Sequence, residues 1–251
     1  MYPILFQYKA LAIGGYGIML GLAFYIAFLL LEREFKLRGI NPELAYKILL
    51  AVIPSAIIGA KLFHIIDYFD EFLVDPWGML ISGSGLTVYG GYILAIIVCI
   101  ILIRKNKENV LQIFDITAVP LALGYAIGRI GCHVAGDGCY GIASNSIFAV
   151  SYPNGLSPTT ESVYPTPLFE SFLSFIIFAV LMQLRKKELP QGMIFFLYIA
   201  LNGITRFLIE FIRINPKTFL GLSQAQIIAV LFVLAGTAGM IFVTRKAKVA
   251  A

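Results

Sequence analysis

The sequence predicts an all-α membrane protein whose chain crosses the bilayer several times. Hydrophobic residues make up 59% of the 251 residues and charged residues only 13%, against about 25% in a typical soluble domain. The mean hydropathy is +0.88, and apolar stretches of roughly twenty residues, the length that spans a bilayer, recur along the chain. This composition excludes a disordered chain and a nucleic-acid-binding protein, although the pI is near 9.0.

Seven apolar stretches qualify as membrane-spanning helices. They lie at roughly 10–31, 44–66, 84–103, 113–135, 167–184, 191–212 and 222–243. We expect them to form one bundle domain over residues 1–251, because no stretch is left for a separate soluble domain. The first stretch lacks a small-residue cleavage site before the next charges, so we expect a retained span and not a signal peptide.

Basic residues alternate between the connections and predict the orientation of the spans. Three Lys or Arg follow each of the first, third, fifth and seventh spans, whereas the N-terminal segment and the other connections hold three in total. The positive-inside rule therefore predicts an N-terminus outside and a C-terminus in the cytoplasm. On the non-cytoplasmic side, residues 67–83 and 136–166 leave room for a small loop cap over the bundle.

Ionisable side chains within or beside the spans are the candidate site residues, since a charge at a helix centre costs about 2.5–3.5 kcal/mol. Most lie in the outer halves of their spans, so we expect them to converge at one depth. Arg206 and Glu210 are four residues apart and can pair on one helix face, which Arg213 extends. A buried structural ion pair is the alternative interpretation. The candidates are Lys61, His64, Arg129, His133, Asp137, Glu170, Arg206 and Glu210.

Arg129 and Arg206 belong to different predicted helices with few acidic residues nearby in the sequence. A guanidinium group binds phosphate oxygens bidentately and keeps its charge when it is desolvated. The phosphate available at this depth is a phospholipid headgroup. We therefore expect the two arginines to meet around one lipid headgroup in the membrane.

Glycines punctuate the segment GYAIGRIGCHVAGDGCYG, residues 124–141. Gly124, Gly128 and Gly131 have the spacing that lets helices approach closely, so packing alone accounts for some of them. The run 136–138, Gly-Asp-Gly, predicts a tight turn whose exposed backbone amides form an anion-binding nest.

The three cysteines leave alternatives open. Cys99 lies in an apolar run, which is typical of an inert buried thiol. Cys132 and Cys139 flank the predicted turn, and a disulfide between them is open if both face an oxidising compartment. With His133 and Asp137 they also carry metal-ligating atoms, but this spacing matches no standard structural zinc pattern, so we expect no metal site.

Several segments share the pattern of one enzyme family. They are GGYGIMLGLAF in the first span, GLTVYGG at the start of the third, GRIGCHVAGDGCYG at the end of the fourth, and NGITRFLIEFIR followed by GLSQAQI. YPTPLFE, which ends at Glu170, fits a proline-rich start of the fifth span. Together they resemble the prolipoprotein diacylglyceryl transferases, membrane enzymes of bacteria, over nearly the whole chain. That family has seven spans with the N-terminus out and the C-terminus in.

The resemblance implies an activity. Members of this family move the diacylglyceryl group of phosphatidylglycerol to the thiol of the lipobox cysteine in a prolipoprotein, and they release glycerol 1-phosphate. It therefore implies these two substrates as partners in a lipid membrane, no cofactor, and a multi-pass protein of the bacterial cytoplasmic (inner) membrane that serves lipoprotein biosynthesis.

The resemblance also assigns residues. Arg129 in GRIG and Arg206 in TRF match the family's essential arginines, and Asp137 takes its acidic position after GRIG. Glu210 and Arg213 match the family's EF.R pair, and we expect both to bind substrate.

Five further residues are expected to bind substrate or stand where the family pattern changes. Tyr16 matches the aromatic residue of the first-span YG motif, and we expect it to bind substrate with Gly90, Gly136 and Asn202. Asn202 itself replaces the tyrosine that usually begins YG..RF. Tyr89 stands in VYGG where the best-known members have HGG, so a histidine proposed to help deprotonate the thiol is missing.

Two more departures lie in the fourth-span segment. Cys132 replaces an asparagine, and GDGCYG replaces the common GELWGR. The base that accepts the thiol proton is then to be sought among Tyr89, His133 and Asp137. His133 is our preferred base, because it lies four residues from Arg129 and its ordinary pKa suits proton transfer; an interfacial hydrogen-bonding role is the alternative. These departures also leave open a divergent paralogue with another acceptor or donor, and a non-catalytic lipid-binding or transport protein.

Overall fold

A computed structural model describes residues 3–8, 11–82, 87–219 and 221–250. The chain divides into two compact units, a large unit of Met1–Leu30 with Phe114–Ala251 and a small unit of Leu31–Ile113. Helix α1 (Gly15–Leu37) begins in the large unit and ends in the small one. Each unit is described by itself.

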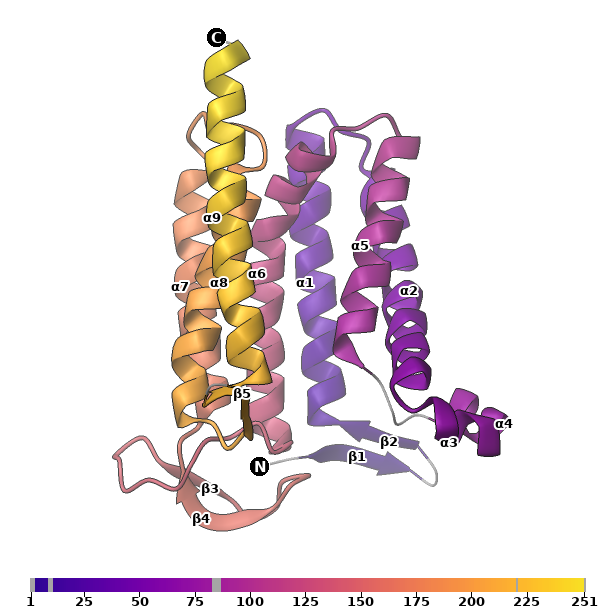
Figure 1. The fold of residues 1–251 in the computed structure, drawn as a ribbon, viewed down its shortest axis with the longest axis vertical. Helices are drawn as coiled ribbons and strands as arrows, with labels where there is room; N and C mark the ends of the chain where they lie inside the picture. The colour runs from indigo at the N-terminus through magenta and orange to yellow at the C-terminus, as the bar shows by residue number, and fades with distance from the viewer. Residues whose placement is uncertain (1–2, 9–10, 83–86, 220, 251) are drawn as a thin grey trace. The chain divides into compact units, whose positions relative to one another are not determined.

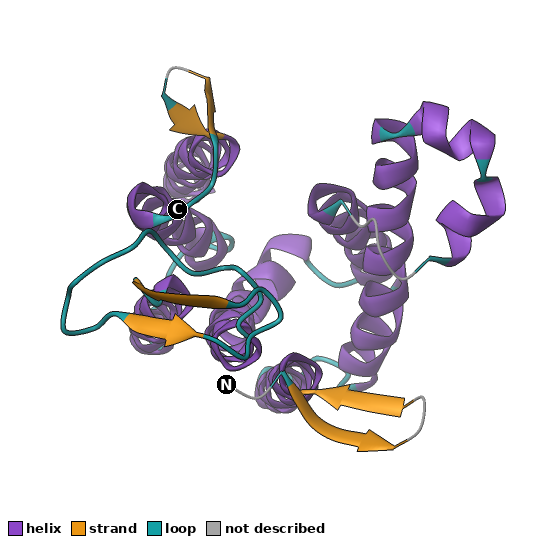
Figure 2. Cartoon of the chain, turned by 90° about the horizontal axis from the view of Figure 1, so that it is seen from below, coloured by secondary structure: helices purple, strands orange, loops and turns teal. Residues whose placement is uncertain are grey.

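Long apolar helices build the large unit. They are α6 (Val110–Ala135), α7 (Thr166–Leu184), α8 (Met193–Ile209) with a 3-10 turn η1 (Glu210–Ile212), and α9 (Gln224–Ala250). Figure 1 shows α8 between α7 and α9, and the end-on view of Figure 2 shows the same helices clustered. Buried side chains of α6, α7 and α8 pack together, among them Ala118, Leu181 and Ile194.

An acidic side chain fixes the start of α8 against α6. Gly192 has a φ of +94°, a left-handed conformation that glycine adopts without strain. The carboxylate of Asp115 in α6 accepts hydrogen bonds from the amides of Gly192 at 2.6 Å and Phe195 at 2.8 Å. A carboxylate at a helix N-terminus satisfies amides that have no partner within the helix. This cap therefore sets the position of α8, the helix that carries Arg206, relative to α6.

Three antiparallel hairpins complete the large unit. They are β1 (Ile4–Tyr8) with β2 (Leu11–Gly14), β3 (Val150–Tyr152) with β4 (Thr159–Val163), and β5 (Lys217–Phe219) with β6 (Leu222–Ser223). Figure 1 shows β3, β4 and β5 at the end of the unit where α6 ends and α7 begins. The cap expected as loop over 136–166 thus contains a hairpin, which the fully buried Tyr152 anchors.

The small unit holds α2 (Glu43–Asp67), α3 (Phe69–Val74), α4 (Pro76–Ile81) and α5 (Val88–Lys105). Helix α2 packs along α5 through glycines: a Cβ on Gly90 would lie 2.3 Å from the carbonyl oxygen of Gly59. Only glycine permits so close an approach of two backbones. The predicted connection at 67–83 is also partly helical, since α3 and α4 lie within it.

Six helices of the described residues are long and apolar enough to cross a membrane: α1, α2, α6, α7, α8 with η1, and α9. The third predicted span, 84–103, overlaps the 18-residue helix α5, and its start at 84–86 lies outside the described residues. The structure thus has the predicted class, a mostly helical polytopic membrane protein.

Two helices that follow a hairpin begin later than the rough boundaries predicted from the sequence. The first span was expected from residue 10, but Leu11–Gly14 pair in a hairpin and the helix begins at Gly15. The last was expected from residue 222, but the helix begins at Gln224. Ser223 and Gln226 form a capping box there, in which the Ser223 hydroxyl accepts from the Gln226 amide and the Gln226 side chain accepts from the Ser223 amide.

Candidate functional site

Arg129 of α6 and Arg206 of α8 meet at one carboxylate, that of Glu170 in α7. Arg129 pairs through Nε with Glu170 Oε2, and Arg206 Nη1 lies 2.7 Å from Glu170 Oε1. Arg213 Nη1 lies 3.3 Å from the same Oε1 atom. The hydroxyl of Tyr125 donates to Glu170 Oε2 at 3.0 Å and accepts from Arg129. Three guanidinium groups and a phenol therefore surround one buried carboxylate.

A second carboxylate supports two of these arginines. Glu210 Oε2 lies 3.2 Å from Arg206 Nη2 and 3.6 Å from Arg213 Nε. Its other oxygen accepts hydrogen bonds from Ser223 and Asn215. The predicted pairing of Arg206 with Glu210 is present, and the start of α9 holds it through Ser223.

The three arginines differ in how far their side chains are buried. The side chains of Glu170 and Glu210 are 3% and 0% exposed, and that of Arg213 is 7% exposed. Arg129 and Arg206 keep 16% and 26% of their side-chain surface accessible. The cluster holds three guanidinium groups and two carboxylates, so one positive charge is uncompensated when all are ionised, and the two accessible arginines present it.

The turn after α6 lies beside Arg129. Gly136 and Gly138 have φ values of +60° and +85°, and the amide of Cys139 donates to Asp137 Oδ1 at 3.1 Å. Arg129 Nη1 lies 3.8 Å from the sulfur atoms of both Cys132 and Cys139. The predicted tight turn is thus present, and the anion nest expected there stays a prediction.

The electrostatics of the turn favour a Cys139 thiolate. A hydrogen bond from the Cys132 thiol and the charge of Arg129 lower the pKa of Cys139 below its usual range. All three cysteines of the chain are free thiols in the structure. The predicted disulfide alternative is therefore not formed, although the two outer cysteines are neighbours.

The hairpin β3–β4 contacts His133 through Tyr152. His133 Nδ1 lies 2.9 Å from the hydroxyl of Tyr152, and the two rings meet edge to face at 5.5 Å. Burial raises the pKa of Tyr152, so its phenol stays protonated and shares this hydrogen bond with the imidazole, whose tautomer sets the direction. Tyr152 also stacks on Tyr140 at 5.1 Å. These contacts support the hydrogen-bonding alternative for His133, whose role as base stays a prediction.

Hydrogen bonds to backbone groups hold the turn against the rest of the site. The Thr166 hydroxyl at the start of α7 donates to the Cys139 carbonyl at 2.5 Å. The amides of Gly141 and Ile142 donate to the carbonyls of Tyr164 and Ile212. The turn that carries Asp137 is therefore held to the start of α7, which bears Glu170, and to the end of η1, which precedes Arg213.

Tyr16 lies on α1 where that helix meets α6. A Cβ on Gly131 would lie 3.3 Å from the Tyr16 ring and 3.0 Å from the side chain of Met19. Gly131 thus permits the close approach that its spacing predicts, whereas Gly128 has open space at its Cβ position. The Tyr16 side chain is 40% exposed.

The other predicted site residues belong to α5, to α8 and to the turn after α6. Tyr89 and Gly90 belong to the small unit, where Gly90 packs against α2. Asn202 lies one turn before Arg206 in α8, and its side-chain amide donates to the Tyr198 carbonyl within the same helix. Gly136 carries no side chain, and a Cβ there would lie 2.7 Å from the backbone of Gly155. Close packing requires a glycine at both positions, and their contact with substrate stays a prediction.

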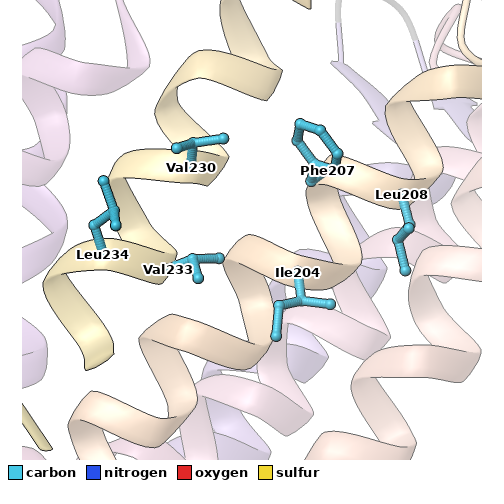
Figure 3. A pocket seen from close by; sticks show the side chains of 6 residues that line it. All are labelled: Ile204, Phe207, Leu208, Val230, Val233 and Leu234. Atoms are coloured by element: carbon cyan, nitrogen blue, oxygen red, sulfur yellow. The ribbon is translucent and has the colours of Figure 1, made fainter. Parts of the chain in front are cut away.

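A shallow pocket of about 250 Å³ lies between α8 and α9, on faces that carry exposed apolar side chains (Figure 3). Its lining is wholly apolar: Ile204, Phe207, Leu208, Val230, Val233 and Leu234. Arg206 is on α8 as well but turns toward α6 and α7, where its partner Glu170 lies. The pocket therefore lacks the polar groups of a reaction site and suits hydrocarbon.

Sequence reasoning missed the centre of the cluster. Glu170 counted as an intramembrane charge and as the end of YPTPLFE, but it was assigned no role. Tyr125 is not among the predicted site residues, because a tyrosine among glycines in an apolar span has no distinctive spacing. Counting the charges within the spans would point to Glu170, because two intramembrane arginines on separate helices require an acidic partner.

The whole sequence is similar to one known protein family. The sequence profile of the family described as prolipoprotein diacylglyceryl transferase matches residues 3–242. A phosphatidylglycerol–prolipoprotein diacylglyceryl transferase of Dehalococcoides mccartyi is 34% identical over 98% of this chain and 95% of its own length. Proteins of the same name from Leptospira interrogans (32% identical, 81% of this chain, 72% of its own length) and Clostridium tetani (30%, 94%, 95%) are also similar.

The match extends over both units and includes every residue of the arginine and carboxylate cluster. The resemblance noted in the separate motifs is thus a relationship of nearly the whole sequence. The chain belongs to the prolipoprotein diacylglyceryl transferase family.

Proposed function

We propose that this chain transfers the diacylglyceryl group of phosphatidylglycerol to the lipobox cysteine thiol of prolipoproteins and releases glycerol 1-phosphate. One observation carries the assignment of the site: three guanidinium groups face two buried carboxylates, and the two accessible arginines lie on different helices. A phosphodiester monoanion neutralises the charge that remains. Family membership supports the reaction itself.

The reaction requires an anion to form on the leaving group. A thiolate sulfur attacks the glycerol carbon that carries the phosphate ester, the carbon–oxygen bond breaks, and its electron pair goes to the phosphate oxygen. Arg129 and Arg206 would hold that phosphate and stabilise the growing charge. By analogy with a donor of an oxyanion hole, each contact is worth about 2–4 kcal/mol in a site without water.

The carboxylates have a positioning role in this proposal. Glu170 holds Arg129 and Arg206 at one point, and Glu210 holds Arg206 against the start of α9. Because these ion pairs already hold the guanidinium groups in place, little reorganisation of the arginine side chains is needed when the substrate anion binds. Arg213, almost wholly buried, adds charge and stiffness behind them.

His133 and Asp137 are the candidate acceptors of the thiol proton within the large unit, and the role of Tyr89 in the small unit stays a prediction. His133 and Asp137 flank the end of α6, on the side of Arg129 that carries the turn. A thiol with a pKa near 8.5 is a few per cent ionised at neutral pH, so a residual rate is expected without any base. Tyr16 would bind the substrate beside the turn, with Asn202 near Arg206.

The membrane arrangement follows from the charge pattern. We propose seven spans in the bacterial cytoplasmic membrane, with α5 as the third, the N-terminus outside and the C-terminus in the cytoplasm. The cluster then lies toward the outer leaflet, where phosphatidylglycerol and a secreted prolipoprotein both reach it. The apolar faces of α8 and α9 would contact the acyl chains (Figure 3).

A purified-enzyme assay tests the proposal. The full-length protein in phosphatidylglycerol nanodiscs, given a lipobox peptide, should yield a thioether-linked peptide and glycerol phosphate in equal amounts. A peptide with serine in place of the cysteine is the substrate control. Arg129→Gln should abolish both products, whereas Arg245→Gln, at an exposed position of α9, should not. Absence of both products, while an active relative forms them in parallel, refutes the function.

A further inference from the structure

Three metal-ligating side chains meet at the turn after α6. The sulfur atoms of Cys132 and Cys139 and a carboxylate oxygen of Asp137 all lie within 4.8 Å of one another. Around a tetrahedral Zn²⁺, with Zn–S near 2.3 Å and Zn–O near 2.0 Å, such atoms lie roughly 3.5–3.8 Å apart. Side-chain shifts of about 1 Å therefore suffice to enclose an ion.

The backbone keeps these ligands together. Cys132 belongs to the last turns of α6, and the left-handed glycines at 136 and 138 fold the chain back so that Asp137 and Cys139 return to it. The Cys139 amide donates to Asp137, and the Thr166 hydroxyl donates to the Cys139 carbonyl. Two of the three ligands thus lie on a turn that is hydrogen-bonded within itself and to α7.

Charge and ligand chemistry favour zinc. Two thiolates and a carboxylate around a divalent ion leave one negative charge, and Arg129 Nη1 lies 3.8 Å from both sulfur atoms, close enough for attraction to that charge. Thiolate ligands select soft or borderline ions such as Zn²⁺ over Mg²⁺ and Ca²⁺. The sequence spacing led us to expect no metal, because it matches no structural zinc motif. Proximity in the folded chain does not require such spacing.

We propose that Cys132, Asp137 and Cys139 bind one Zn²⁺ whose fourth position is open to the thiol of the acceptor. Three protein ligands and one open position are typical of catalytic zinc sites, whereas structural sites are closed by four. The role of the open position rests on the proposed function.

The acceptor thiol binds the zinc as a thiolate and gives its proton to water, since coordination lowers the pKa of a thiol strongly. A sulfur electron pair then forms the bond to the glycerol carbon, and the electrons of the broken carbon–oxygen bond go to the phosphate. The product is a thioether, a weaker ligand than a thiolate, so it leaves the ion. Arg129 contacts the sulfur ligands and belongs to the phosphate-binding cluster, so it links the two sites.

Metal content tests the site without any activity. The full-length protein, purified in detergent without chelator, should carry about one zinc per chain. Substitution with Co²⁺ should give the charge-transfer absorption of thiolate ligands. Cys132→Ser and Cys139→Ser should lose both signals, and Asp137→Asn should bind more weakly. Cys99→Ser, which changes a cysteine of α5 in the small unit, is the matched control and should keep both.

Other results overturn the proposal. A wild-type chain that takes up no zinc after incubation with Zn²⁺, or a Cys132/Cys139 double variant that binds as much as wild type, refutes the site. An intact mass two hydrogens lower, with only one titratable thiol, shows a disulfide instead. A thermal unfolding curve for each variant separates lost ligation from a failure to fold.

An activity measurement tests the open position separately. Removal of zinc with a chelator should lower the transfer rate at least tenfold, and added Zn²⁺ should restore it. Unchanged activity in the metal-free enzyme refutes coordination of the acceptor. A zinc-loaded protein that transfers nothing refutes the proposed function, and the metal content then still decides whether the site exists.

Discussion

Replacement of Glu170 by glutamine is the sharpest test of the cluster. The substitution keeps the shape of the side chain, removes the charge that pairs with Arg129, Arg206 and Arg213, and raises the net charge of the cluster from one to two. Removal of one partner from a buried ion pair costs about 3–5 kcal/mol. For a chain of this size that corresponds to a fall in Tm of roughly 6–20 °C.

The kinetic effect should appear in kcat and not in KM. An anionic lipid is still attracted by the more positive cluster, but the guanidinium groups are no longer held at one point in the transition state. We expect kcat to fall about 100-fold, which corresponds to about 2.7 kcal/mol, comparable to the loss of one oxyanion-hole donor. KM for phosphatidylglycerol should stay the same or decrease.

The assay measures initial rates of glycerol phosphate release over a range of phosphatidylglycerol contents in nanodiscs, below the Tm of each variant. Glu161→Gln, at an exposed position of β4, is the matched control and should behave as wild type. A Glu170→Gln enzyme with unchanged kcat and Tm refutes the positioning role. A raised KM at unchanged kcat contradicts it as well, because that pattern indicates a carboxylate that serves substrate binding alone.

Three further substitutions test separate parts of the structure. Arg206→Lys keeps the charge but loses the planar fork, so kcat/KM should fall at least 30-fold in the transfer assay; a smaller loss shows that charge alone is required. Ser223→Ala removes the α9 N-cap and a hydrogen bond to a buried carboxylate, so it should destabilise the protein by about 1–2 kcal/mol in thermal unfolding, and an unchanged Tm contradicts the cap. Gly136→Ala places a Cβ at positive φ, 2.7 Å from the backbone of Gly155, and should lower Tm clearly. Gly128→Ala, with open space at its Cβ, is its control, and equal Tm values for the two would refute the close contact.

Local boundaries show where sequence reasoning fails. Hydropathy extends the first predicted span back to residue 10 because the residues before Gly15 are apolar, but apolar character does not distinguish a hairpin from a helix over so few residues. The start of α9 carried a usable signal, since Ser223 and Gln226 have the spacing of a capping box. The hydrophobic period and the length of a segment predict that a helix or strand exists, and capping groups decide where it begins.

The sequence by itself determined the solvent of this protein and its family. Low charge and recurrent apolar stretches leave a bilayer as the only environment in which the chain buries enough surface, and the arginines and glycines of its motifs match one family over residues 3–242. Hydropathy and motif content are sums over local stretches of sequence, so both can be determined without coordinates.

Only the tertiary structure decided which charges meet. Glu170 lies 41 residues from Arg129 and 36 from Arg206 along the chain, and no spacing rule joins them. They pair because α6, α7 and α8 pack side by side, and because a buried charge must find an opposite charge within a few ångströms. The meeting of Cys132 with Asp137 and Cys139 has the same origin, since two left-handed glycines fold the chain back onto α6.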